Sequence, residues 1–263
     1  IICKFLAKNN KLNKDLNNGI TLIDTYLFDN FYKSDRYYGN FYENIPSKLK
    51  KNIYFAPTII STNFHNLIRI YNYLGSLKDK YVLKENYIKL IDLIELIKYH
   101  FFKSKINFDK KYNKYDLGKL IKEIYDNDNR FYFIYESLLT YKFIINLSKA
   151  NIKIKTSINW YENQIIDKAW NLGFNKYFPD TILKGYRGIV PPNLYISQMY
   201  PTEFERMSRV LPKKIIVIGK GFINETSKYL EKNIVEIGPA LRFENIFKMH
   251  KFNKTKQYKI LIL

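Results

Sequence analysis

The sequence predicts an α/β protein with a Rossmann-like, doubly wound and mostly parallel sheet. From residue 151 onward, short apolar segments alternate with helix-type segments, which is the order of βαβ units. Each apolar segment stops at glycine or polar residues, as strands do at the ligand-binding edge of open α/β sheets. With 263 residues, of which 46% are hydrophobic, the chain is long enough to bury a sizeable core.

The first half of the chain predicts packing elements and little chemistry. Residues 1–60 have the pattern of mixed strands and turns, and the helical spacing of apolar residues begins at residue 63. We therefore predict a Rossmann-like N-terminal domain over 1–257 with a mainly helical insertion at about 63–126. The individual predictions are a strand at 53–60, helices within 63–104, a polar loop at 107–114, and helices at 116–126 and 131–149.

The second half has clearer start and stop signals. Thr202 and Glu205 have the spacing of a capping box, which predicts a helix that continues to about Val210. Gly173 is expected to end the preceding helix, and Asn224 to cap the following one. The predicted strands are 152–161, 181–186, 214–218 and 234–237, and the predicted helices are 164–172, 203–210 and 225–231.

The two ends of the sequence suggest a longer protein. The chain does not begin with Met, and it ends on an apolar run, Lys259–Leu263, with no turn after it. We expect residues 258–263 to be the first strand of a second, C-terminal domain.

The charge of the chain is strongly basic. Lys and Arg number 44 against 24 Asp and Glu, which gives a net charge of +20, yet only seven of the basic residues are Arg. The first explanation is codon drift toward AT, which enriches Lys, Asn, Ile and Tyr. On this explanation the surplus of basic residues only makes a solvated basic surface and reflects no ligand. Proximity to an anionic membrane is the second explanation, and nucleic acid is not an expected partner. The single cysteine, Cys3, excludes an internal disulfide and, with no signal peptide visible, predicts a cytoplasmic protein.

The run Trp160–Gln164 contains the first candidate catalytic residue, Glu162. It lies where a predicted strand ends and a helix begins, so its carboxylate could accept a proton from a substrate hydroxyl. The alternative is that Glu162 only caps the following helix, where negative charge is favoured.

The run Lys184–Gly188 contains the second candidate, Arg187. Glycines at 185 and 188 would let the backbone approach a ligand, and arginine suits bidentate contact with phosphate or carboxylate. An ordinary surface turn is the competing interpretation.

The run Gly219-Lys220-Gly221 follows a predicted strand and matches part of a dinucleotide fingerprint. Asn224 occupies the place of the third glycine, which disfavours a dinucleotide oxidoreductase. We instead expect a tight turn that lines a cleft. Further on, Arg242 either faces such a cleft or is solvated on a linker.

No metal site is expected. Asp126-Asn127-Asp128 lies in a predicted polar turn and lacks the glycine of a calcium loop, and the three histidines are scattered.

Taken together, these motifs resemble bacterial surface-carbohydrate biosynthesis proteins of O-antigen and capsule gene clusters, which look like two-domain glycosyltransferases of the GT-B type. The resemblance covers about residues 130–263. It rests on Trp160–Lys168, Lys184–Gly188, Pro201–Glu205, Val217–Phe222 and Ile237–Phe243. In such enzymes the N-terminal domain mainly binds the acceptor and the C-terminal domain mainly binds the nucleotide-sugar donor. The resemblance therefore implies that residues 1–257 are the acceptor-type domain and that 258–263 begin the donor-type domain. It also implies that this fragment alone is inactive, because the donor contacts are missing from it.

The resemblance implies an enzyme that transfers a sugar from a nucleotide sugar to a glycan or lipid-linked glycan, without a metal or other cofactor. It would act in the cytoplasm or at the cytoplasmic face of the inner membrane. Glu162 would be the general base, if the enzyme inverts. The residues expected to bind substrate are Gln164, Tyr186, Arg187, Gly219, Lys220, Gly221 and Arg242. The alternative is a non-catalytic, basic Rossmann-like module that binds a nucleotide or a partner.

Overall fold

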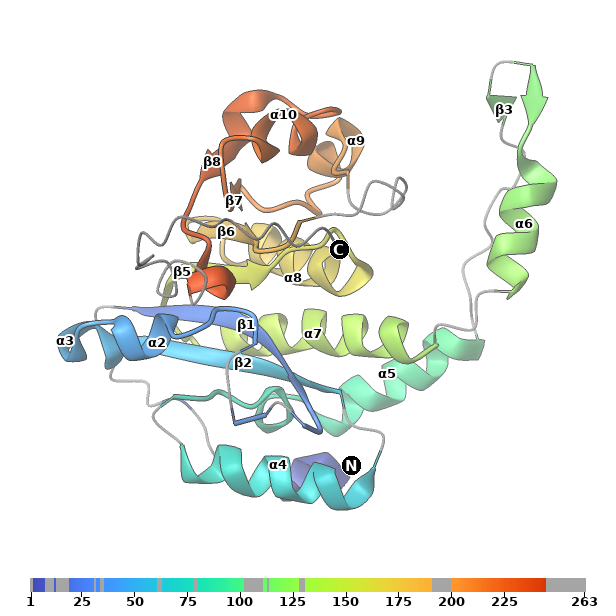
Figure 1. Ribbon diagram of the computed structural model, residues 1–263. Helices are drawn as coiled ribbons and strands as arrows, with labels where there is room; N and C mark the ends of the chain where they lie inside the picture. Colours follow the sequence, from blue (N-terminus) through green and yellow to red (C-terminus); the bar gives the residue numbers. More distant parts are fainter. Residues whose placement is uncertain are drawn as a thin grey trace, which may run out of the picture.

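The protein is built around a six-stranded parallel sheet with helices on both faces (Figure 1). The computed structural model describes residues 2–7, 12, 19–30, 32–33, 36–60, 63–77, 80–101, 111–112, 114–127, 131–190 and 200–244. Every pair of neighbouring strands in the main sheet is parallel. The predicted α/β class with a Rossmann-like, doubly wound sheet is confirmed.

The order of the strands reverses once. The spatial order is β2-β1-β5-β6-β7-β8, and a parallel bridge between Phe55 and Tyr81 extends the sheet beyond β2. Starting from β1, the chain first adds β2 and the segment at Tyr81 on one side of the sheet. From β5 onward it adds every later strand on the other side. The point of reversal, where ligands bind in folds of this kind, lies between β1 and β5. The strands are β1 (Ile20–Phe28), β2 (Ile53–Ile60), β5 (Ile154–Trp160), β6 (Ile182–Arg187), β7 (Lys214–Val217) and β8 (Val235–Ile237).

Strand β1 occupies the middle of the sheet, although the sequence predicted only mixed strands and turns for its region. Side chains alternate between the two faces of a strand, so β1 contributes to two cores. Leu22 joins the core under α7 (Phe131–Lys149) and α8 (Ile165–Tyr177), and Ile23 joins the core under α4 (Phe64–Ser76). The other predicted strands are present, with ends shifted by at most two residues.

Helix α8 differs from its prediction at its C-terminus. It continues to Tyr177, so Gly173 lies inside the helix rather than at its cap. A Cβ atom at Gly173 would lie 2.8 Å from Cδ1 of Ile144 in α7. The glycine therefore permits close packing of the two helices. The local sequence could not show this role, because the partner residue lies in another helix.

The C-terminal helices are shorter than predicted. The capping box of α9 (Glu203–Met207) is confirmed, because the Thr202 hydroxyl accepts from the Glu205 amide. The helix stops before Arg209, which has a φ of 60°. Helix α10 (Phe222–Thr226) begins after Gly221, and Asn224 lies within it, so the prediction that Asn224 is its cap was wrong.

The segment predicted as a helical insertion contains α4, the 3-10 turn η1 (Lys84–Asn86), α5 (Leu90–Phe101) and α6 (Gly118–Asn127). In Figure 1, α6 and a small hairpin stand away from the sheet. The hairpin falls partly within the predicted loop 107–114, and Asp126 and Asn127 belong to α6 rather than to a turn. The remaining elements are α1 (Ile2–Leu6), α2 (Phe41–Asn44), α3 (Ser47–Lys50), β3 (Lys111–Tyr112), β4 (Tyr115–Asp116), η2 (Lys232–Ile234) and η3 (Leu241–Phe243).

The predicted strand at 258–263 and Asp128 lie wholly outside the described residues, and the predicted helical region 63–104 and loop 107–114 lie partly outside them. Of the helices in the described ranges, none has the length and apolar character needed to cross a bilayer.

Candidate functional site at the carboxyl edge of the sheet

Aromatic rings and a carboxylate meet where β1 and β5 end. Tyr37, from the loop after β1, packs edge-on against Trp160 at the end of β5, with ring centroids 4.6 Å apart. Glu162 follows two residues later. Its Oε1 accepts a 2.6 Å hydrogen bond from Nε1 of Trp160, and its Oε2 accepts a 2.8 Å bond from Nε2 of Gln164. The carboxylate is thus oriented by two side chains at the reversal point of the sheet, where ligands are expected.

The capping role considered for Glu162 belongs to Asp167. The Oδ2 atom of Asp167 accepts from the backbone amides of Glu162 and Gln164, at 2.8 and 3.0 Å. Asp167 is fully buried, and this desolvation raises the pKa of its carboxyl to about 8 despite those bonds. Because Asp167 ties down the turn, the side chain of Glu162 is left for other contacts.

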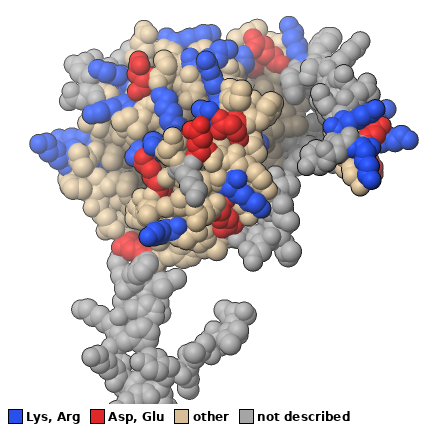
Figure 2. All heavy atoms as spheres, turned by 90° about the horizontal axis from the view of Figure 1, so that it is seen from above, with Lys and Arg blue, Asp and Glu red and all other residues tan. Residues whose placement is uncertain are grey.

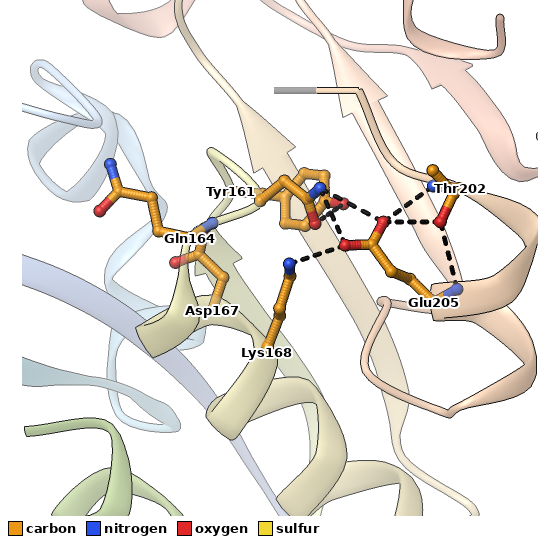
Figure 3. Close-up of polar contacts among 7 residues, drawn as sticks. Tyr161, Gln164, Asp167, Lys168, Thr202 and Glu205 are labelled. Atoms are coloured by element: carbon orange, nitrogen blue, oxygen red, sulfur yellow. Dashed lines mark hydrogen bonds and ion pairs between the residues drawn. The ribbon is translucent and has the colours of Figure 1, made fainter. Parts of the chain in front are cut away.

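Glu205, by contrast, is occupied by structural contacts (Figure 3). It accepts from Lys168 at 2.7 Å, from Asn163 at 3.3 Å, and from the backbone amide of Thr202 at 2.9 Å. Burial opposes its ionisation, but the hydrogen bonds from Lys168 and Thr202 outweigh burial and lower the pKa of Glu205. Glu205 therefore joins the β5–α8 turn to α9, and Gln164 points away from it in Figure 3.

Arg187, at the end of β6, is buried rather than part of a surface turn. Its side chain is only 2% exposed, and Nη1 donates to the hydroxyl of Thr226 at 3.3 Å. Among the described residues, its Nε and Nη2 atoms have no hydrogen-bond partner. These two nitrogens form one side of the guanidinium fork, the arrangement that binds carboxylate or phosphate through two bonds. Desolvation lowers the pKa of Arg187, and Glu162 is close enough to act on it electrostatically.

The glycines beside Arg187 make room for aromatic rings. A Cβ at Gly188 would lie 2.5 Å from the Trp160 ring, and one at Gly185 would lie 2.9 Å from the Tyr161 ring. Tyr186 is itself buried. Its hydroxyl donates to the carbonyl of Pro239 at 2.9 Å and accepts from the amide of Leu241 at 3.0 Å. Tyr186 thus holds the segment after β8 against the sheet.

The remaining predicted binding residues lie in two other places. Gly219, Lys220 and Gly221 form the turn after β7, where Gly219 is half-buried and the other two are exposed. Among the described atoms, none lies within 4 Å of a Cβ built on Gly221. Arg242 lies on η3 and lines a separate cleft. The structure therefore joins Glu162 directly to Gln164 and places Arg187 within electrostatic reach of Glu162, while Tyr186 has a packing role.

Three functional candidates in the first half were missed. Asp24, Tyr26 and Tyr37 all lie in or just after β1. Asp24 is fully buried, and within the part of the chain that the structure describes neither of its carboxylate oxygens has a hydrogen-bond partner. Desolvation raises its pKa to about 7, although the nearby ammonium of Lys84 opposes the rise. An aspartate in the middle of the apolar run Ile20–Phe28 is a signal that could have identified this strand as unusual.

Charged side chains are interspersed on the face above α9 and α10 (Figure 2). Lys and Arg surround Asp and Glu there, rather than forming one basic patch. The expectations about anionic membranes and nucleic acid therefore stay predictions. Among the described residues, no group of three or more His, Cys, Asp or Glu is placed to hold a metal ion.

No family model, curated protein or solved structure matches this chain. The resemblance to surface-carbohydrate biosynthesis proteins thus stays a prediction, and the functional argument depends on the geometry of the site.

Proposed function

We propose that the protein transfers a sugar from a nucleotide sugar to a hydroxyl of a glycan acceptor. The observation that supports this most is the position of Glu162. Its carboxylate lies at the reversal point of the sheet and is oriented by Trp160 and Gln164. Aromatic rings with a neighbouring carboxylate also suit a sugar, which offers an apolar face and hydroxyl donors.

In this mechanism Glu162 accepts the proton of the acceptor hydroxyl. The oxygen attacks the anomeric carbon of the donor, and the bond from that carbon to the nucleoside diphosphate breaks. Arg187 would stabilise the charge that develops on the leaving diphosphate, since two of its nitrogens are unpartnered. The basic surface would favour contact with anionic lipid.

The test replaces Glu162 by Gln, which keeps the size of the side chain and removes its basicity. The complete gene product would be incubated with radiolabelled UDP-, GDP-, dTDP- and CMP-linked sugars and a glycan-lipid extract, and labelled product would be counted. Loss of a general base reduces turnover by about 100-fold or more. The control is Glu236→Gln, a half-buried glutamate on β8 that pairs with Lys214.

Turnover at the wild-type rate by Glu162→Gln would refute the assignment of the base. Binding of a nucleotide without turnover of any donor would favour the alternative, a non-catalytic nucleotide-binding module.

A further inference from the structure

A basic cleft forms a second candidate site in the molecule. It is a cleft of about 580 Å³ between the loop after β1, the start of the bridged segment at Lys80, and η3. Four cations line it against two carboxylates, Glu43 and Glu244, which leaves a surplus of positive charge. The four cations are Lys33, Arg36, Lys80 and Arg242. They come from three separate parts of the chain, so the fold itself gathers them.

Two of these cations are held by aromatic rings. The ammonium of Lys80 lies 4.3 Å from the centre of the Tyr42 ring and 3.7 Å from Glu43. The guanidinium of Arg36 lies 5.9 Å from the centre of the Phe28 ring. Side chains that are already ordered lose less conformational entropy when an anion binds.

Arg242 is positioned by contacts on both sides of η3. The hydroxyl of Tyr186 bonds to Pro239 and Leu241 just before it. On the other side, Gly39 has a φ of 56°, and a Cβ there would lie 2.5 Å from the carbonyl oxygen of Leu241. Only glycine fits this approach, so the turn at Gly39 and the segment at Leu241 form one wall of the cleft.

Tyr37 connects the cleft to the proposed catalytic residue. Its ring packs on Trp160. Burial and the charge of Glu162 raise the pKa of Tyr37 to about 12, while Arg36 and Arg242 oppose the rise. Tyr37 is therefore within electrostatic reach of Glu162 and of both arginines.

We propose that this cleft binds the diphosphate of a sugar diphosphate ester, with Lys33, Arg36, Lys80 and Arg242 as its binding residues and the sugar against Tyr37 beside Glu162. The inference rests on the proposed function for the place of the sugar. A nucleotide and an isoprenoid lipid both carry such a diphosphate, and both offer the same recognition chemistry. Its negative charge matches the surplus of the cleft.

The test measures binding by calorimetry at about 50 and 150 mM salt, because surface charge effects are screened as salt rises. The probes are inorganic pyrophosphate, UDP-glucose and farnesyl diphosphate. The double variant Arg36→Gln/Arg242→Gln should weaken pyrophosphate binding at least about 10-fold, since each arginine supplies charge-assisted hydrogen bonds. The control, Lys119→Gln/Lys122→Gln on α6, removes the same charge from exposed positions away from the cleft.

Equal weakening in the two double variants would overturn the proposal, because it would indicate attraction to net charge alone. So would the absence of one-to-one pyrophosphate binding by the wild type, or binding that is lost in Arg187→Met and kept in the cleft variant. With the cleft confirmed, tighter binding of farnesyl diphosphate identifies the lipid source, and tighter binding of UDP-glucose identifies the nucleotide.

This result is separable from the test of Glu162. Turnover that depends on Glu162 but not on the cleft refutes only the diphosphate site. Cleft-dependent binding in a protein that does not need Glu162 refutes only the proposed base.

Discussion

The turn after β6 is closed, whereas the turn after β7 is open. Both combine glycine with one cation, Arg187 in the first and Lys220 in the second. Gly188 is covered by the rings of Trp160 and Tyr186, and Arg187 is 2% exposed. Gly221 has free space around it, and Lys220 is exposed. A glycine beside a cation can therefore serve either of two purposes. It can let other side chains of the protein pack closely, or it can leave space in which a ligand could bind.

The difference between these turns arises from residues that approach from elsewhere in the chain. Trp160 belongs to β5 and reaches Gly188 because β5 and β6 are neighbours, with Trp160 paired to Tyr186. The turn after β7 follows a strand that lies between β6 and β8, and β8 is three residues long. Less of the protein is available there to fill the space left by a missing side chain.

The largest expected effect is that of Gly188→Ala. The new methyl group would lie 2.5 Å from two ring carbons of Trp160 and 2.6 Å from the ring of Tyr186, both of them buried. Overpacking of this kind costs about 3 kcal/mol of unfolding free energy. Urea unfolding followed by tryptophan fluorescence measures it. A loss below about 0.5 kcal/mol would mean that the turn after β6 is as open as the turn after β7.

A second prediction concerns the pH dependence of the unfolding free energy, to which the buried Asp24 should contribute and the buried Arg187 should not. Arginine stays charged throughout the accessible pH range, so it adds no pH dependence. Asp24 has a folded pKa raised from 3.8 to about 7, so its protonated form favours the folded state. That contribution is complete below about pH 4 and is lost as the pH rises toward 7.

The measurement compares the unfolding free energies of the wild type and Asp24→Asn at pH 5, 6, 7 and 8. The wild type should lose about 2 kcal/mol relative to the variant over this range, within the limit of about 1.4 kcal/mol per pH unit for one proton. Asp167 titrates in both proteins, and only the part of its pKa rise that comes from the charge of Asp24 is absent from the variant. Parallel pH profiles would show that Asp24 is already ionised in the folded protein.

The main strand ends of the second half could be predicted because their signals are local. An apolar run that stops at Gly219 or Gly238 identifies a strand and its end without knowledge of its neighbours. Strand β1 was not located, because Asp24 and Thr25 interrupt its apolar pattern although both are buried.

The roles of individual site residues depend on contacts between distant segments. The helix-capping bonds at the β5–α8 turn go to Asp167 and not to Glu162, which requires the turn at Asn163, whose φ is 59°. Tyr37 meets Trp160 only because β1 and β5 become neighbours after the chain has built β2 and its helices. No local pattern encodes either result.

A third prediction concerns the unpartnered guanidinium. Replacing a buried charge that has no ion-pair partner by an apolar side chain of similar length stabilises a protein by about 1–2 kcal/mol. Arg187→Met should therefore be more stable than the wild type in an anion-free buffer. Pyrophosphate should stabilise both proteins by the same amount, because the cleft that is proposed to bind it is unchanged in Arg187→Met.

Thermal unfolding with and without pyrophosphate provides the measurement, and Lys220→Met is the matched control from the open turn. We expect no change in stability for Lys220→Met, because its side chain is solvated. Destabilisation of Arg187→Met would contradict the interpretation, since it would assign the guanidinium a structural role within the protein.

The smallest expected effect is that of Gly221→Ala. Gly221 has a φ of −62° and a ψ of −23°, which alanine adopts without strain, and its Cβ would contact nothing within 4 Å. Alanine restricts the unfolded chain, so the variant should gain about 0.5 kcal/mol of stability. Denaturant unfolding measures that gain. Calorimetry with UDP-glucose tests whether a ligand binds in the open space beside Gly221. Unchanged binding would make the turn after β7 a plain surface turn, while weaker binding in this stable variant would show that a ligand approaches the backbone where the protein leaves room.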